Sequence, residues 1–245
     1  MIGRHRQKSK ARAAVRPFDP RVVIACDSGE PAEVLFARAT PREQDLLSGI
    51  SHQGRFRQSL LARLAGHSAI EQILLSGRRG NCIDIVKGPN GEPLVYVDGK
   101  VGLVSLSLAH SGLLGVAVAW RGDQRELAAG VDVERVRETD VSESSYAFSQ
   151  SELRLIARRR DEEDLGLIAW SAKEAAWKAL QPRADWGPDT VEIQRLDTHA
   201  GHAEIKTRGQ ALVRLGPKTI DVRIRKVKGP DGQYILSLAR LGGGL

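Results

Sequence analysis

The stretch from residue 191 to 241 constrains the fold most, because apolar and polar side chains alternate along it in short segments. Such alternation places one set of side chains on each face of an extended chain, which is typical of half-buried β-strands. We therefore expect an antiparallel sheet at this end of the chain. The expected strands are VEIQRL (191–196), AEIKT (203–207), ALVRL (211–215), IDVRIRKV (220–227) and YILSLARL (234–241).

Helices and strands are mixed in the rest of the chain. Thr40 with Glu43, and Ser149 with Glu152, form capping boxes that predict the starts of two helices. Helical spacing of apolar residues predicts a long helix over 55–76, and residue propensities predict another over 166–180. Because the order is not a regular strand–helix–strand repeat, the expected fold class is α+β. The remaining expected strands are 21–28, a hairpin over 82–97, two short strands within 104–120, and 127–136.

Composition sets broad limits on the class of protein. With 245 residues, the chain is long enough for one large domain or two small fused ones. Cys26 and Cys82 fit neither a metal-ligand pattern nor a disulfide framework, so a cytoplasmic location is expected. No apolar run approaches the roughly 20 residues that a membrane span needs, so no membrane contact is expected.

Residues 1–18 are expected to form a basic, flexible N-terminal tail. The net charge of the chain is +7, and residues 1–16 contain six basic side chains and no acidic one. The rest of the chain is therefore almost neutral, which weakens the argument for an anionic partner of the globular part. A solvated leader without a specific role explains such a tail. Contact with nucleic acid or anionic lipid, and a transit peptide, are the alternatives.

The segment GVDVE (130–134) places two carboxylates two residues apart in an expected strand. Asp132 and Glu134 then share one face, about 7 Å apart along the strand, while Val131 and Val133 face the core. Two carboxylates on one face repel unless a cation lies between them or water screens them. A hard cation such as Mg²⁺ prefers oxygen ligands and retains waters for a phosphate substrate. The alternative is the solvated face of an amphipathic strand.

The helical segment AWSAKEAAWKAL (169–180) carries the other charged candidates. Glu174 and Lys178 lie four residues apart and share a helix face with Trp170. By itself, this spacing is that of an ordinary surface ion pair worth a few tenths of a kcal/mol. A third carboxylate beside Asp132 and Glu134 would instead complete a metal site, and a nearby lysine would neutralise a phosphate.

His110 follows a strand and precedes a glycine-containing turn, where loops often carry functional residues. Arginines of the long helix are natural partners of phosphate groups. Taken singly, a surface histidine and a polar helix face are the alternatives for these residues.

The ordered set of a histidine after a strand, then GVDVE, then WSAKEAAWK resembles the 4′-phosphopantetheinyl transferase superfamily. Its length and upstream segments are similar to the longer, monomeric type that activates surfactin synthetase. RFRQSLLAR (55–63) is similar to the arginine-bearing helix of the family, and GPNGEP (88–93) to its Gly-Lys-Pro turn. The resemblance covers about residues 40–240. It implies two similar α+β halves, 19–125 and 126–245, in a pseudo-twofold arrangement with the active site between them.

The resemblance implies a reaction and roles for particular residues. Such enzymes transfer the 4′-phosphopantetheine group of coenzyme A to a serine of an apo acyl or peptidyl carrier protein, and they release adenosine 3′,5′-bisphosphate. By similarity, Asp132, Glu134 and Glu174 would hold Mg²⁺ or Mn²⁺, and Glu174 would be the base, directly or through a water. The implied contacts to coenzyme A come from Arg57, Arg63, His110, Ser111, Lys173 and Lys178. A monomer that binds no nucleic acid is expected.

The chain departs from the family pattern at two positions that bear on coenzyme A binding. Glu92 stands where the turn usually has lysine, and Ala109 where the residue before the histidine is often serine. Two other classes of function remain open at this point. One is a different Mg²⁺-dependent phosphate or pyrophosphate enzyme that uses the same acids. The other is a module that binds nucleic acid through the basic tail.

Overall fold

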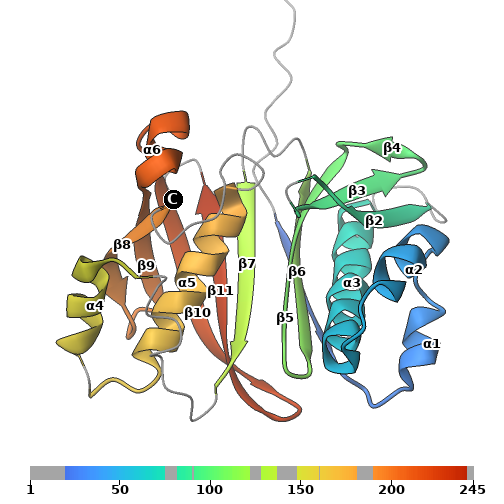
Figure 1. Ribbon diagram of the computed structural model, residues 1–245, viewed down its shortest axis with the longest axis horizontal. Helices are drawn as coiled ribbons and strands as arrows, with labels where there is room; N and C mark the ends of the chain where they lie inside the picture. Colours follow the sequence, from blue (N-terminus) through green and yellow to red (C-terminus); the bar gives the residue numbers. More distant parts are fainter. Residues whose placement is uncertain are drawn as a thin grey trace, which may run out of the picture.

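The computed structural model describes residues 20–74, 82–89, 91–121, 128–136, 148–159, 161–180 and 190–241. The expected tail, residues 1–18, therefore lies outside the described residues. Within the described ranges, no helix is long and apolar enough to cross a membrane. The elements fall into two groups along the chain, called here the N-terminal half (β1 to β6) and the C-terminal half (β7 to β11) (Figure 1).

The N-terminal half consists of β1 (Arg21–Cys26), α1 (Ala32–Phe36), α2 (Pro41–Ser48), α3 (Gln53–Leu74), β2 (Ile83–Lys87), β3 (Pro93–Val97), β4 (Lys100–Val101), β5 (Val104–Ser111) and β6 (Leu114–Arg121). The C-terminal half consists of β7 (Ala128–Arg135), α4 (Gln150–Ala157), α5 (Leu165–Leu180), β8 (Val191–Asp197), β9 (His202–Thr207), α6 (Gly209–Leu215), β10 (Thr219–Gly229) and β11 (Gly232–Leu241).

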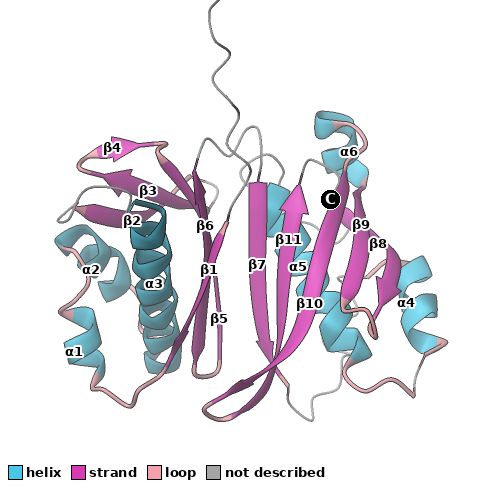
Figure 2. Cartoon of the chain, turned by 180° about the vertical axis from the view of Figure 1, so that it is seen from behind, coloured by secondary structure: helices cyan, strands magenta, loops and turns pink. Residues whose placement is uncertain are grey.

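The described strands pair antiparallel in sheets ordered β1-β6-β5, β2-β3-β4 and β7-β11-β10-β9-β8. The long helix α3 packs against β1, β6 and β5, and α5 packs against β7, β11 and β10. Figure 2 shows the C-terminal sheet from the side opposite α5. The architecture is therefore a mixed arrangement of helices and antiparallel sheets, in agreement with the α+β expectation.

Most of the expected helices and strands are present, and one of the predictions is wrong. The segment ALVRL was expected to be a strand, but it lies in the helix α6. This helix ends before Gly216, whose φ is positive at 69°. Five residues are too few to distinguish a strand from a helical turn by the pattern of apolar side chains alone. Both expected capping boxes are confirmed, at Thr40 for α2 and at Ser149 for α4.

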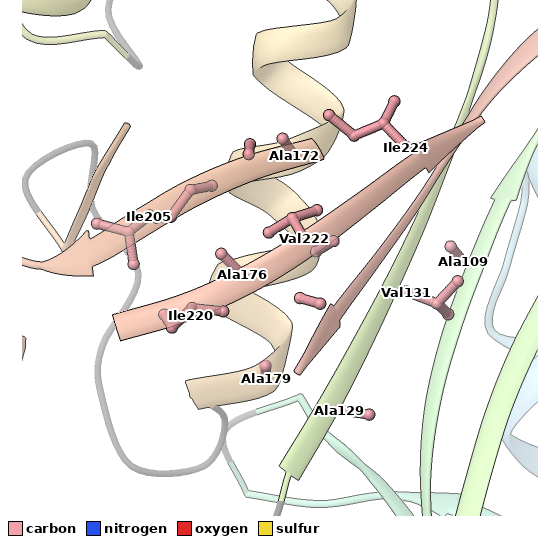
Figure 3. Packing of buried hydrophobic residues seen from close by; sticks show 14 of the residues in the cluster. Ala109, Ala129, Val131, Ala172, Ala176, Ala179, Ile205, Ile220, Val222 and Ile224 are labelled. Carbon is pink, nitrogen blue, oxygen red and sulfur yellow. The ribbon is translucent and has the colours of Figure 1, made fainter. Parts of the chain in front are cut away.

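The core of the C-terminal half lies between α5 and its sheet. Figure 3 shows Ala172, Ala176 and Ala179 spaced along α5 behind the strand β10, which carries Ile220 and Val222, and these side chains are fully buried. Small side chains allow the helix backbone to come close to the sheet. Gly130 of β7 marks the closest approach, because a Cβ atom there would lie 2.0 Å from the carbonyl oxygen of Ala175. The absence of a side chain at position 130 therefore allows α5 to lie this close to β7.

The strand β7 is buried on both faces, which is more than its sequence pattern indicates. Val131 and Val133 are almost fully buried and belong to a cluster that includes Leu114 and Val116 of β6. The opposite face, which carries Gly130, is covered by α5. Asp132 and Glu134 alternate with the valines and therefore face the helix rather than open solvent.

Serine side chains join the two halves along β5 and β7. These strands are edge strands of different sheets, and they lie beside each other (Figure 1). The Ser107 hydroxyl accepts a hydrogen bond from the Val131 amide at 3.2 Å, and the Ser111 hydroxyl accepts one from the Arg135 amide at 3.1 Å. Side-chain oxygens thus satisfy strand amides that would otherwise be unpaired at a buried edge.

A buried carboxylate network occurs in each half. Glu152, in the capping box of α4, accepts hydrogen bonds from the Lys173 amine at 2.7 and 2.8 Å and from the Ile193 amide. Glu43, in the capping box of α2, accepts from the Ile85 amide and lies 3.0 Å from Nε2 of His67. In each half, one glutamate therefore connects a capping box, the long helix and the following strand.

The Glu43 network predicts a pH-dependent contribution to stability. Burial raises the pKa of this carboxyl, but His67 and the two backbone amides outweigh burial and hold the pKa below the ordinary 4.5. The ionised carboxylate therefore stabilises the fold above pH 4.5, and this contribution is lost as the pH falls through the lower folded-state pKa. Glu43→Gln should lower the free energy of unfolding at pH 7 by roughly 1–3 kcal/mol.

Urea unfolding at pH 7 and at pH 3.5 tests this prediction. The difference between the wild type and Glu43→Gln should shrink at the lower pH, whereas Glu71→Gln, at an exposed position of α3, should match the wild type at both. A difference that does not change with pH would contradict the role assigned to the ionised carboxylate.

Candidate active site

The candidate site begins with two acids of β7 that lie under α5. Asp132 is 4 % exposed, and its Oδ1 accepts a hydrogen bond from the Lys178 amine at 2.7 Å. Its other carboxylate oxygen, Oδ2, is buried and has no hydrogen-bond partner among the described residues. The structure therefore excludes a solvated strand face for Asp132 and leaves a buried oxygen with ligand capacity to spare.

Glu174 reaches the same place from α5. Its Oε2 lies 3.8 Å from the Lys178 amine, so one lysine stands between carboxylates of a strand and of a helix. The Glu174–Lys178 pair was expected from its four-residue spacing, but it is not an ordinary surface pair. The two side chains are only 14 % and 17 % exposed, and Asp132 is the closer partner of the lysine.

The carboxylate of Glu134 is held by one donor from each half of the chain. The Ser111 hydroxyl at the end of β5 donates to Oε2 at 3.3 Å. The indole N–H of Trp170 in α5 donates to Oε1 at 3.2 Å. Both donors are neutral, so they orient the carboxylate without cancelling its charge.

The electrostatics of the site are those of carboxylates crowded in a poorly solvated place. Burial, reinforced by the charge of Asp132, raises the pKa of Glu134 to about 7. Burial and the same neighbour raise the pKa of Glu174 to about 7, against the opposing effect of Lys178. Burial alone would lower the pKa of Lys178, but Asp132 and Glu174 raise it above its ordinary value. The site thus favours additional positive charge.

The three acids provide a donor set that fits a hard divalent cation. Asp132, Glu134 and Glu174 offer carboxylate oxygens, which are the ligands that Mg²⁺ prefers. The unpartnered Oδ2 of Asp132 and the raised pKa values of both glutamates agree with a site that gains from a bound cation. Over the described residues, however, no three histidine, cysteine or acidic side chains are already grouped as a metal site. The Lys178 amine lies between Asp132 and Glu174 instead.

His110 lies at the end of β5, beside the acidic site. Its Nδ1 atom is buried without a hydrogen-bond partner in the described part of the chain. Burial lowers the pKa of the imidazole, and the positive charges of Lys178 and Arg55 lower it further. These effects place the lysine of α5 and the first arginine of α3 close enough to His110 to act on it. They make its surroundings suitable for an anionic group.

Two expected phosphate contacts are engaged elsewhere. The Lys173 amine is fully buried and bonded to both oxygens of Glu152, although Lys173 is next to Glu174 in the sequence. Arg57 donates to both carboxylate oxygens of Asp27 and to the Glu30 carbonyl. The structure does not bring either residue to Asp132, Glu134 and Glu174. Each of them instead forms an ion pair with another acidic residue, Glu152 for Lys173 and Asp27 for Arg57.

Two further positions concern the contacts to coenzyme A that the resemblance implied. Nε of Arg63 is buried and unpartnered within the described ranges, and burial lowers the pKa of this guanidinium. Glu92, at a position where the resemblance implied lysine, is 3 % exposed and folds over Gly88. Its carboxylate is therefore directed into its own turn. The charge that acts on the Arg63 guanidinium is that of Glu43, and a contact of Arg63 with a bound anion stays a prediction. The carboxylate of Glu92 does not point out of the turn.

Sequence reasoning missed three features of this site. Trp170 was expected only to share a face with Glu174, but its indole bonds to Glu134. Arg55, rather than Arg57, is the arginine whose charge acts on His110. The contact between Ser111 and Glu134 joins residues 23 positions apart. The four-residue spacing from Trp170 to Glu174 was the one available signal, because such residues lie on the same side of a helix.

Comparison with known proteins found a similarity, which covers the segment that carries the acids of the site. No curated protein matches the chain. A family model described as the 4′-phosphopantetheinyl transferase superfamily matches residues 128–239, which run from β7 into β11 and contain Asp132, Glu134, Glu174 and Lys178. It is thus the C-terminal half, with the acidic site inside it, that is similar to the 4′-phosphopantetheinyl transferase superfamily.

Proposed function

We propose that the protein transfers the 4′-phosphopantetheine group of coenzyme A to a serine of an apo acyl or peptidyl carrier protein. The observation that carries the proposal is the convergence of Asp132 and Glu174 on the Lys178 amine, within the segment that matches the family. Three carboxylates for a hard cation and a lysine for phosphate oxygens suit a pyrophosphate linkage.

In this reaction, the serine Oγ of the carrier forms a bond to the phosphorus that bears the pantetheine arm. The bond from this phosphorus to the bridging oxygen breaks, and adenosine 3′,5′-bisphosphate leaves with the electron pair. Asp132, Glu134 and Glu174 would hold Mg²⁺, which when bound would polarise the phosphoryl group and offset its developing charge. Mn²⁺ has the same preference for oxygen ligands.

The residues of the chain have separate tasks in this proposal. Glu174 is the base that accepts the serine proton, directly or through a water. Lys178 stabilises negative charge on the pyrophosphate and on the leaving group. His110, Arg63 and, from its effect on His110, Arg55 bind the phosphates of the nucleotide. Lys173 and Arg57 are left out because their charges are engaged elsewhere.

The wider organisation belongs to the same proposal. We infer that residues 19–125 and 126–245 form two related halves in a pseudo-twofold arrangement, as in the monomeric, surfactin-synthetase-activating type. The order strand, capped helix, long helix and paired strands occurs in both halves, which supports this. The site lies where Ser111 of the N-terminal half meets Glu134 of the C-terminal half. A cytoplasmic monomer follows from the same resemblance.

The direct test incubates the full chain with coenzyme A, Mg²⁺ and apo carrier proteins from fatty acid, polyketide and peptide synthesis. Intact-protein mass spectrometry should show a gain of one phosphopantetheine group on at least one carrier. Chelation with excess EDTA should abolish the gain, and Mg²⁺ should restore it. Well-folded enzyme that modifies no carrier, or that releases nucleotide from coenzyme A without any carrier, would contradict the proposal.

A further inference from the structure

We propose that Ser111 is a positioning residue that couples the junction between the halves to the orientation of Glu134. This inference rests on the proposed function and replaces the coenzyme A contact that the resemblance implied for Ser111. Its hydroxyl has one proton, which it donates to Oε2 of Glu134 at 3.3 Å. The same oxygen accepts the amide N–H of Arg135 at 3.1 Å. The proton and one of the two lone pairs of the hydroxyl are therefore used inside the protein.

The position of Ser111 allows this small side chain to affect the proposed metal site from the other half of the chain. It is the last residue of β5, in the N-terminal half, whereas the proposed metal ligands all lie in the C-terminal half. Trp170 holds the other oxygen of Glu134 from α5. One donor on each oxygen fixes the plane of the carboxylate, which a ligand with several rotatable bonds does not achieve alone. Loss of Ser111 would leave Glu134 held from one side only.

The protein contains a matched control for this role. Ser107 lies four residues earlier on the same strand, and its hydroxyl accepts the Val131 amide at 3.2 Å. It therefore makes the same kind of bond to β7 as Ser111 does, but that bond joins it to a backbone amide rather than to a carboxylate. Ser107→Ala removes a bond between the halves and leaves the contact to Glu134 intact. Ser111→Ala removes a bond between the halves, the one to the Arg135 amide, and also the contact to Glu134.

The effect on metal binding follows from the role of groups that orient ligands. Removal of such a partner typically costs about 10- to 100-fold in metal affinity. Ser111→Ala should therefore weaken the binding of Mn²⁺ to the coenzyme A complex by about 10-fold. Ser111→Thr, which retains a hydroxyl, and Ser107→Ala should stay within about 2-fold of the wild type. A merely structural role would lower the thermal stability of both alanine variants without separating their metal affinities.

The experiment titrates the full chain with Mn²⁺ in the presence of coenzyme A and follows free Mn²⁺ by electron paramagnetic resonance. Hydrogen exchange at the Arg135 and Val131 amides, measured in parallel, should become faster in Ser111→Ala and Ser107→Ala, respectively. The inference is overturned if the wild type binds no Mn²⁺, if Ser111→Ala binds it as the wild type does, or if Ser107→Ala weakens binding equally. Serine-dependent Mn²⁺ binding without carrier modification would instead contradict the proposed function alone.

Discussion

Glu174→Gln is expected to lower the rate of phosphopantetheinyl transfer by about 10³-fold, because it removes both a proposed metal ligand and the proposed base. The amide is nearly the same size as the carboxylate, so the packing of α5 should be preserved. Burial already disfavours the charged form of this side chain, and its pKa is raised to about 7. The neutral variant should therefore be at least as stable as the wild type.

The measurement pairs the initial rate of carrier modification with the thermal unfolding midpoint. Glu71→Gln, an exposed position of α3, is the control for the loss of a glutamate charge and should leave both values unchanged. Transfer by Glu174→Gln within about 10-fold of the wild-type rate would remove Glu174 from the proposed chemistry. A fall in both activity and unfolding midpoint would show that the packing of α5 was disturbed.

Lys173→Met is expected to lower the free energy of unfolding by about 3–5 kcal/mol, because it leaves the buried carboxylate of Glu152 without its cation. The side chains of Lys173 and Glu152 are 0 % and 1 % exposed, and the amine also lies 5.5 Å from the centre of the Phe148 ring. Burial lowers the pKa of Lys173, whereas its bond to Glu152 opposes that change. The role of this lysine is therefore in stability.

Urea unfolding of a double-mutant cycle separates the ion pair from packing. In a Glu152→Gln background, Lys173→Met should cost about 1–2 kcal/mol, because the remaining glutamine carries no charge and still accepts from the Ile193 amide. Lys173→His supplies the kind of partner that Glu43 has in His67, and it should retain part of the stability. An equal cost of Lys173→Met in both backgrounds would show that charge is not the cause.

The chemistry of the candidate site was more predictable from the sequence than its geometry. Asp132, Glu134 and Glu174 were expected to be metal ligands from the family resemblance, and carboxylates are the ligands that a hard cation prefers. The structure brings two of them to the same lysine. The assignment of Lys173 to the same site was not supported. Neighbouring side chains on a helix diverge by about 100°, so Lys173 and Glu174 serve different surroundings. Residue type alone does not show which of them faces β7.

The sequence by itself determined the elements whose causes are local. Capping boxes set the starts of α2 and α4, and the alternation of side chains determined that Asp132 and Glu134 share a face of β7. The short segment ALVRL escaped this reasoning, because one helical turn and a short strand have the same apolar pattern.

Only the tertiary structure decided which partners meet. Arg57 pairs with Asp27 over 30 positions, Lys178 reaches Asp132 over 46, and Ser111 reaches Glu134 over 23. Each pairing depends on how α3, α5 and the edges of β5 and β7 pack, and no local pattern encodes that packing. Burial between α5 and β7 then changes the electrostatics of Glu134 and Glu174. Water would screen these carboxylates on an open surface, whereas in the buried site they favour additional positive charge.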